Sequence, residues 1–113
     1  MIRFNQTVKF QNDFKKLRKK YQTLLEDFKR LQLALSVCAI PTDKHTAFLT
    51  ENEECRIIKI RLACRALRKS SLRVIYAYFE EDQRIDFIEL YFKGDKENED
   101  KERIKEYLRN KEK

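Results

Sequence analysis

The sequence predicts a small α+β domain, in which a strand and a helical hairpin at the N-terminus and a helix at the C-terminus pack on a twisted antiparallel sheet. Three observations predict it: apolar residues at helical spacing between residues 10 and 38, three strand-like runs between residues 56 and 92, and a charged helical pattern at the C-terminus. The length of 113 residues and the hydrophobic content of 42% suit one domain over residues 1–113.

The N-terminal third is expected to form a short strand followed by two helices. The first nine residues alternate well enough for a strand. From Phe10 the apolar residues recur at steps of four, three and four, which is typical of an amphipathic helix ending near Lys20. Thr23 and Glu26 have the spacing of a capping box, so a second helix is expected from Thr23 to about Cys38.

The middle of the chain is expected to form the sheet. Residues 42–54, TDKHTAFLTENEE, show no clear period and are interpreted as a loop. Strand-like runs follow at about Arg56–Arg65, Leu72–Phe79 and Arg84–Phe92. Their short polar connections favour an antiparallel meander, and the pattern turns helical again after Gly94.

The first of these runs has one apolar and one cationic face, because side chains two apart on a strand share a face. The cationic face is expected to hold Lys59, Arg61 and Arg65. The same two-residue period places four residues of the last run on one face of its strand: Phe87, Glu89, Tyr91 and Lys93. We hypothesise that the meander brings Arg73, Tyr91 and Lys93 toward the cationic face.

The positive charge is concentrated in one part of the chain. The formal net charge is +7, yet residues 80–113 carry twelve acidic and nine basic side chains. Between Arg56 and Arg73 there are seven basic residues and no acidic one. A merely solvated face would mix the signs, because like charges on neighbouring strands repel. The patch therefore favours an anionic partner such as nucleic acid.

Several kinds of site have no support in the sequence. With Gly94 as its one glycine, the chain has no Gly-rich phosphate loop. Its three cysteines lack CxxC spacing and its one histidine, His45, lies in the expected loop, so neither a metal nor another cofactor is predicted. No apolar stretch approaches the length of a membrane span. We expect a soluble cytoplasmic protein without membrane contact.

A family resemblance rests on two stretches, KIRLACRALRKSSLRVIYAY at residues 59–78 and IDFIELYFKGDKEN at residues 85–98. Together they resemble the RelE/ParE superfamily of bacterial type II toxins, most of all its RelE-like branch. The expected helical hairpin also suits this family, so the resemblance omits only residues 42–54. It implies a small α+β toxin fold, a cognate antitoxin bound in a hetero-oligomer, and cleavage of mRNA in the ribosomal A site.

The resemblance also implies site residues. The family's basic residues match Lys59, Arg61, Arg73 and Lys93. RelE itself uses a further tyrosine in the C-terminal segment, but no tyrosine stands between Lys93 and Ile104, and Tyr91 is the nearest substitute. Additional RNA contacts are expected from Arg56, Arg65, Arg68 and Lys69.

A metal-independent ribonuclease must deprotonate the ribose 2′-hydroxyl, stabilise the charge on the phosphorus and protonate the leaving oxygen. Lysine or tyrosine serves as the base only where neighbouring cations lower its pKa. We hypothesise that Lys59 or Tyr91 is the base, that Arg61 and Arg73 clamp the phosphate, and that Lys93 assists the leaving group. Two alternatives are open: a ParE-type inhibitor of DNA gyrase and a non-catalytic RNA-binding module of the same fold.

Overall fold

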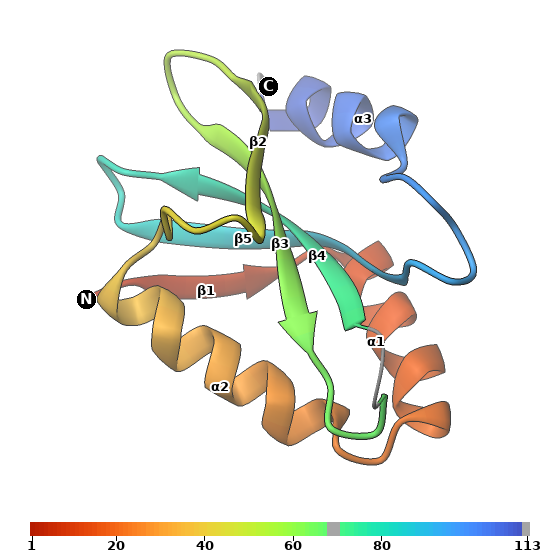
Figure 1. The fold of residues 1–113 in the computed structure, drawn as a ribbon. Coiled ribbons are helices and arrows are strands. Elements are labelled where there is room, and N and C mark those ends of the chain that lie inside the picture. The colour runs from red at the N-terminus through yellow and green to blue at the C-terminus, as the bar shows by residue number, and fades with distance from the viewer. Residues whose placement is uncertain (68–70, 112–113) are drawn as a thin grey trace.

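The computed structural model describes residues 1–67 and 71–111 and contains three helices and five strands within them (Figure 1). In chain order these are β1 (Arg3–Gln6), α1 (Val8–Lys20), α2 (Leu24–Val37), β2 (Thr46–Glu51), β3 (Arg56–Ala63), β4 (Ser71–Phe79), β5 (Arg84–Phe92) and α3 (Lys101–Lys111). The predicted α+β class is confirmed, as are the N-terminal strand, both N-terminal helices, the three central strands and the C-terminal helix.

The five strands form one sheet in the order β1-β5-β4-β3-β2. Strands β3, β4 and β5 are the predicted antiparallel meander. The short β1 pairs with β5 in parallel, with Phe4 opposite Ile85, so the complete sheet is mixed rather than wholly antiparallel.

The interpretation of residues 42–54 as a loop is wrong, because Thr46–Glu51 forms the edge strand β2 and pairs antiparallel with β3. The side chains of β2 are mostly exposed, and Phe48 is 59% exposed. In addition, the register shifts between Phe48 and Thr50. An edge strand held mainly by its backbone hydrogen bonds shows little of the alternation on which sequence prediction depends.

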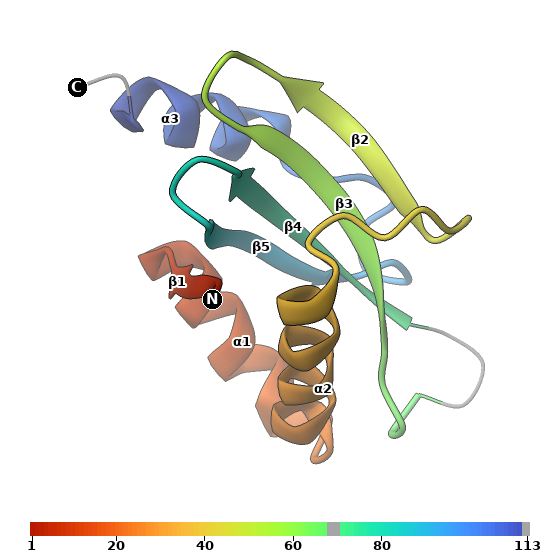
Figure 2. The ribbon, with the colours of Figure 1, turned by 90° about the vertical axis from the view of Figure 1, so that its left-hand side faces the viewer.

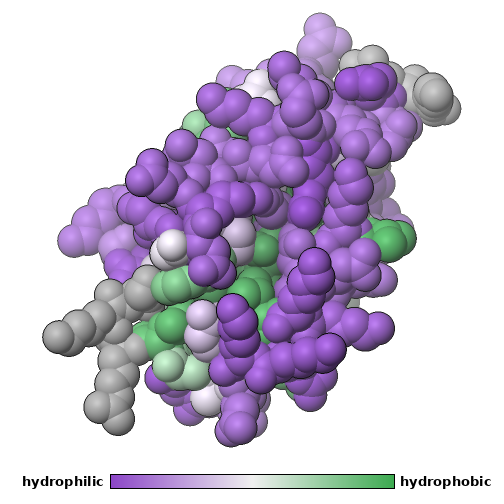
Figure 3. All heavy atoms as spheres, turned by 90° about the vertical axis from the view of Figure 1, so that its right-hand side faces the viewer, coloured by the Kyte–Doolittle hydropathy of each residue, from purple (hydrophilic) through white to green (hydrophobic). Residues whose placement is uncertain are grey.

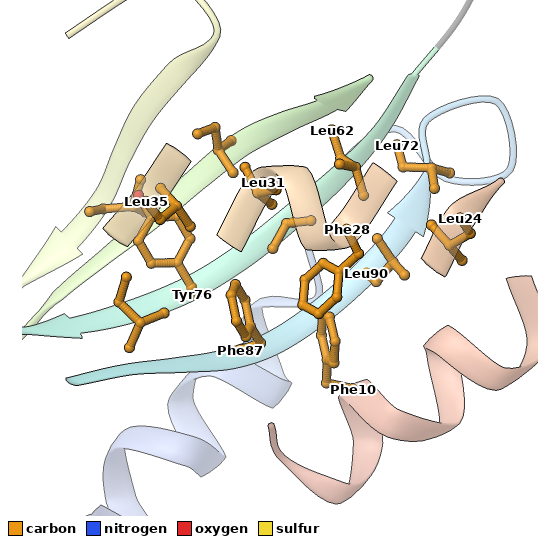
Figure 4. Close-up of a cluster of buried hydrophobic side chains, with 14 of the residues drawn as sticks. Phe10, Leu24, Phe28, Leu31, Leu35, Leu62, Leu72, Tyr76, Phe87 and Leu90 are labelled. Atoms are coloured by element: carbon orange, nitrogen blue, oxygen red, sulfur yellow. The ribbon is translucent and has the colours of Figure 1, made fainter. Parts of the chain in front are cut away.

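Helices α1 and α2 cover one face of the sheet, side by side in Figures 1 and 2. Aromatic rings join the layers in Figure 4: the Phe87 ring of β5 lies 5.4 Å from that of Phe10 on α1 and 4.8 Å from that of Phe28 on α2, between ring centroids. Each fully buried side chain of this size contributes about 1.5–3 kcal/mol through apolar burial. This main core fixes the sheet on which the candidate site lies.

Helix α3 packs on the opposite face of the sheet. Ile104, Tyr107 and Leu108 contact a smaller apolar cluster that includes Ile57 of β3 and Ile75 of β4. Polar contacts also hold α3 in place. The Tyr107 hydroxyl donates to Asp86 of β5 at 2.5 Å, and Arg103 forms an ion pair with Asp13 of α1 at 2.6 Å. Part of the face that carries the predicted cations is therefore covered by α3.

The predicted capping box at the start of α2 does not form. Thr23 precedes the helix, but its backbone is helical and its side chain caps no N–H of α2. Its hydroxyl instead donates to Asp27 at 2.7 Å and accepts from the N–H of Ala66 at 3.2 Å. The residue thus ties the helix to the chain after β3, a long-range role that local spacing does not reveal.

A bulge in β5 corrects the predicted faces of that strand. Tyr76 of β4 lies opposite Phe87, whereas the preceding Ile75 lies opposite Glu89, so Ile88 is an extra residue. Phe87 consequently packs in the main core, while Glu89 and Tyr91 lie on the other face. The expectation that Phe87 shares their face is wrong, because a bulge shifts the period of two.

Candidate RNA-binding and catalytic site

The register of the sheet brings together three of the residues singled out from the sequence. Arg61 of β3 lies opposite Arg73 of β4, and Arg73 lies opposite Tyr91 of β5. Lys59 is two residues before Arg61 on the same strand and therefore on the same face. We call these four residues the basic row. It combines one phenol with three cations on one face of the sheet.

The two arginines of the basic row differ in their surroundings. Arg61 is exposed, whereas Arg73 is partly buried and donates to the Ser71 hydroxyl and to the carbonyl of Leu72. These bonds orient the guanidinium of Arg73 along its own strand. A planar guanidinium donates two parallel hydrogen bonds to a phosphate, so this pair is suited to hold one.

Lys59 has a carboxylate partner that the sequence analysis missed. Its ammonium lies 3.0 Å from Glu99, and the two side chains are 26% and 11% exposed. Glu99 belongs to residues 93–100, here called the connecting segment, which loops out between β5 and α3 (blue in Figure 1). The cationic face thus includes an acid, supplied by a distant part of the chain.

Tyr91 is nearly buried, at 6% exposed, beneath this segment. Burial, together with the carboxylates of Glu99 and Glu89, raises the pKa of Tyr91 to about 12 against the opposing effect of Arg73. The Lys96 ammonium lies 5.1 Å from the centroid of the Tyr91 ring. At neutral pH Tyr91 is a neutral phenol, which can donate a hydrogen bond but is a poor proton acceptor.

Glu89 of β5 holds the connecting segment against the sheet. Its side chain is 1% exposed, forms an ion pair with Lys96 and accepts a hydrogen bond from the N–H of Asp100 at 2.8 Å. A buried carboxylate with two such partners holds the chain on both sides of Glu99. The alternation of residues 89–93 predicts that Glu89 shares the face of Tyr91, but no local pattern indicates the partners of Glu89.

The remaining predicted residues lie outside the basic row. Lys93 is exposed just past the end of β5. Arg56, at the opposite end of β3 from Arg61, pairs with Glu51 at 3.5 Å. The expectation that Arg65 shares the face of Lys59 and Arg61 is wrong, because β3 ends at Ala63. Arg65 instead pairs with two carboxylates of α2, Glu26 at 2.7 Å and Asp27 at 3.4 Å. Arg68 and Lys69 are outside the described residues.

In the part of the chain that the structure describes, no group of His, Cys, Asp and Glu is arranged to hold a metal ion. None of its helices is both long and apolar enough to cross a membrane. Figure 3 shows a largely hydrophilic surface with a limited hydrophobic area on the side that faces right in Figure 1.

Comparison with solved structures identifies the architecture. The chain matches a structure described as the archaeal RelE–RelB complex from Pyrococcus horikoshii OT3, with a TM-score of 0.60 over 82% of this chain and 96% of that chain. The fold is RelE-like. Sequence identity is 18%, so the match establishes the fold alone. No family model matches the sequence, and no curated protein matches it either.

This RelE-like fold puts the strand residues of the predicted site on one face of the sheet and leaves the opposite face to α1 and α2. The separation has a simple cause. Apolar side chains at alternate positions of β3 and β4 are needed for the main core, and the intervening positions then point to the other face. The basic row is therefore a direct consequence of strand period and register.

Proposed function

We propose that this protein is the toxin of a type II toxin–antitoxin system and inhibits translation by cleaving mRNA in the ribosomal A site. The observation that carries the proposal is the direct opposition of Arg61 and Arg73 on a RelE-like sheet, with Lys59 on the same face. Like charges placed opposite each other cost stability in the absence of an anion. A bound phosphodiester removes that cost and explains the arrangement.

In this proposal Arg61 and Arg73 hold the scissile phosphate and stabilise the charge that develops on it. Lys59 supplies a third cation, and exposed Lys93 contacts the backbone and protonates the leaving oxygen. Tyr91 forms a wall of the site and donates a hydrogen bond, since its raised pKa makes it unsuitable as the base. Arg56, Arg65, Arg68 and Lys69 contribute attraction for RNA at longer range.

The proposed partners are mRNA, the ribosome and a cognate antitoxin. The matched structure is a complex of RelE with RelB, which supports an analogous hetero-oligomer for this chain. The net charge of +7 favours a partner with an acidic segment, because such a segment competes with RNA for the cationic face.

The test is primer extension on a defined mRNA incubated with the protein, with and without translating ribosomes. We expect cleavage on ribosomes alone, lost in Arg61→Ala and Arg73→Ala and retained in Lys15→Ala, which removes an exposed cation from α1. Intact mRNA with wild-type protein would overturn the proposal. In that event a supercoiling assay separates gyrase inhibition from non-catalytic RNA binding.

A further inference from the structure

The connecting segment holds the Glu99 carboxylate beside Lys59 of the basic row. Glu89 fixes the segment at Lys96 and at the N–H of Asp100. The Asp100 side chain in turn accepts from the N–H of Arg103 at 3.0 Å, which caps the start of α3. Glu99 lies between these anchors, so its backbone position is fixed from both sides.

The Glu99 side chain is directed to the basic row rather than to solvent. Its carboxylate lies 3.0 Å from the Lys59 ammonium and is 11% exposed. Its charge also acts on Tyr91, the residue opposite Arg73. Glu99 therefore shares one face of the sheet with the groups proposed to hold the phosphate.

Neither residue singled out from the sequence as the base suits that task. Tyr91 is a buried neutral phenol, and Lys59 is engaged as a hydrogen-bond donor to Glu99. Burial alone would raise the pKa of Glu99, but its own backbone N–H and the Lys59 ammonium outweigh burial and hold that pKa below its usual value. Glu99 is thus an ionised carboxylate at neutral pH, and it can accept a proton once Lys59 is withdrawn from it.

We propose that Glu99 is the general base of the cleavage reaction, an inference that rests on the proposed function. The RNA phosphate takes the place of Glu99 on Lys59, and the released carboxylate accepts the proton of the ribose 2′-hydroxyl. The 2′-oxygen attacks phosphorus as the bond from phosphorus to the 5′-oxygen breaks, and Lys93 donates a proton to that oxygen. The products are a 2′,3′-cyclic phosphate and a 5′-hydroxyl, and water then restores both protonation states.

A purely structural ion pair between Glu99 and Lys59 is the competing interpretation, as is a carboxylate that blocks the phosphate site. The three roles predict different effects of removing the charge. A base is needed for the chemical step, a structural pair is needed for stability, and a blocking group slows RNA binding. Glu99→Gln keeps the size and hydrogen-bonding capacity of the side chain, so it separates these roles.

The experiment is single-turnover cleavage of mRNA on programmed ribosomes by wild type, Glu99→Gln and Glu97→Gln. Glu97 is exposed two residues away and controls for the loss of one negative charge from the same segment. We expect Glu99→Gln to cleave roughly 10²–10⁴-fold more slowly than wild type, while the protein concentration that gives the half-maximal rate is unchanged or lower. Glu97→Gln is expected to stay within about twofold of the wild-type rate.

A Glu99→Gln rate equal to or above that of wild type would overturn the assignment in favour of a structural or blocking role. If thermal unfolding shows that Glu99→Gln is not folded, Glu99→Asp provides the same test. Glu99→Asp keeps a carboxylate, so its cleavage rate is expected to fall less than that of folded Glu99→Ala. Equal cleavage rates for Glu99→Asp and Glu99→Ala would overturn the proposal. Absence of cleavage by wild type overturns the proposed function, and this role with it.

Discussion

Arg61 and Arg73 lie directly opposite each other on the neighbouring antiparallel strands β3 and β4. Directly opposed side chains have Cβ atoms about 5 Å apart, so two positive charges in these positions repel. The connecting segment brings Glu99 to Lys59, the neighbouring cation, at 3.0 Å. The arrangement combines a cationic pair suited to a phosphate with a carboxylate held close by.

The first prediction concerns RNA affinity and its salt dependence. Arg61→Ala and Arg73→Ala should each weaken binding of a single-stranded RNA and lower the slope of log affinity against log salt by about 0.7, the value for one phosphate contact. Fluorescence anisotropy at several salt concentrations measures both effects. Lys15→Ala, which removes an exposed cation from α1, is the matched control and should leave the slope closer to that of wild type.

The second prediction concerns Glu89, the buried anchor of the connecting segment. Glu89→Gln should lower the free energy of unfolding by roughly 2 kcal/mol, because it removes the charge that pairs with Lys96 while keeping an acceptor for Asp100. The Lys96 side chain is 40% exposed, which keeps the loss below that of a fully buried pair. Urea unfolding measures it. Stability equal to that of Glu97→Gln would show that Glu89 does not anchor the segment.

The third prediction concerns alkaline pH. Burial raises the pKa of Tyr91 to about 12. Burial and the hydrogen bond to Asp86 also raise the pKa of Tyr107 well above the ordinary tyrosine value near 10. The folded state then binds more protons than the unfolded state above pH of about 10, so stability is full below that pH and falls as pH rises. Tyr91→Phe should make the fall shallower in unfolding experiments. An unchanged profile would contradict the burial of the phenol.

The fourth prediction concerns acid pH. Asp27 is 3% exposed and accepts from Thr23 and from the N–H of Arg65; these bonds outweigh burial and lower its pKa. A lowered pKa adds stability above the unfolded value near 4 and loses it as pH falls through the folded value. Asp27→Asn should therefore cost about 1–3 kcal/mol at pH 7 and less at low pH. A cost independent of pH would show that the carboxylate charge does not matter.

Much of the fold could be predicted because strands β3, β4 and β5 contain β-branched and aromatic residues in runs bounded by polar turns. The positions of Lys59 and Arg61 on one face follow from the period of two alone. Strand β2 could not be found in this way, since its exposed side chains and register shift leave no alternation.

The parts of the site that sequence reasoning missed depend on long-range contacts. The bulge at Ile88 moves Phe87 to the main core, and nothing in the local composition indicates it. Glu99 is one of several acids in a polar stretch, and its approach to Lys59 depends on the path of the connecting segment and on buried Glu89. An acid-rich stretch after a cationic sheet is a signal worth examining in similar chains.

The most direct test of the account is the chemistry of the RNA ends produced on translating ribosomes. Attack by the 2′-oxygen, without a metal-bound water, predicts an upstream fragment ending in a 2′,3′-cyclic phosphate and a downstream fragment with a 5′-hydroxyl. A polynucleotide kinase labels the downstream fragment directly in that case. A 5′-phosphate on that fragment, or mRNA that stays intact, would contradict the account.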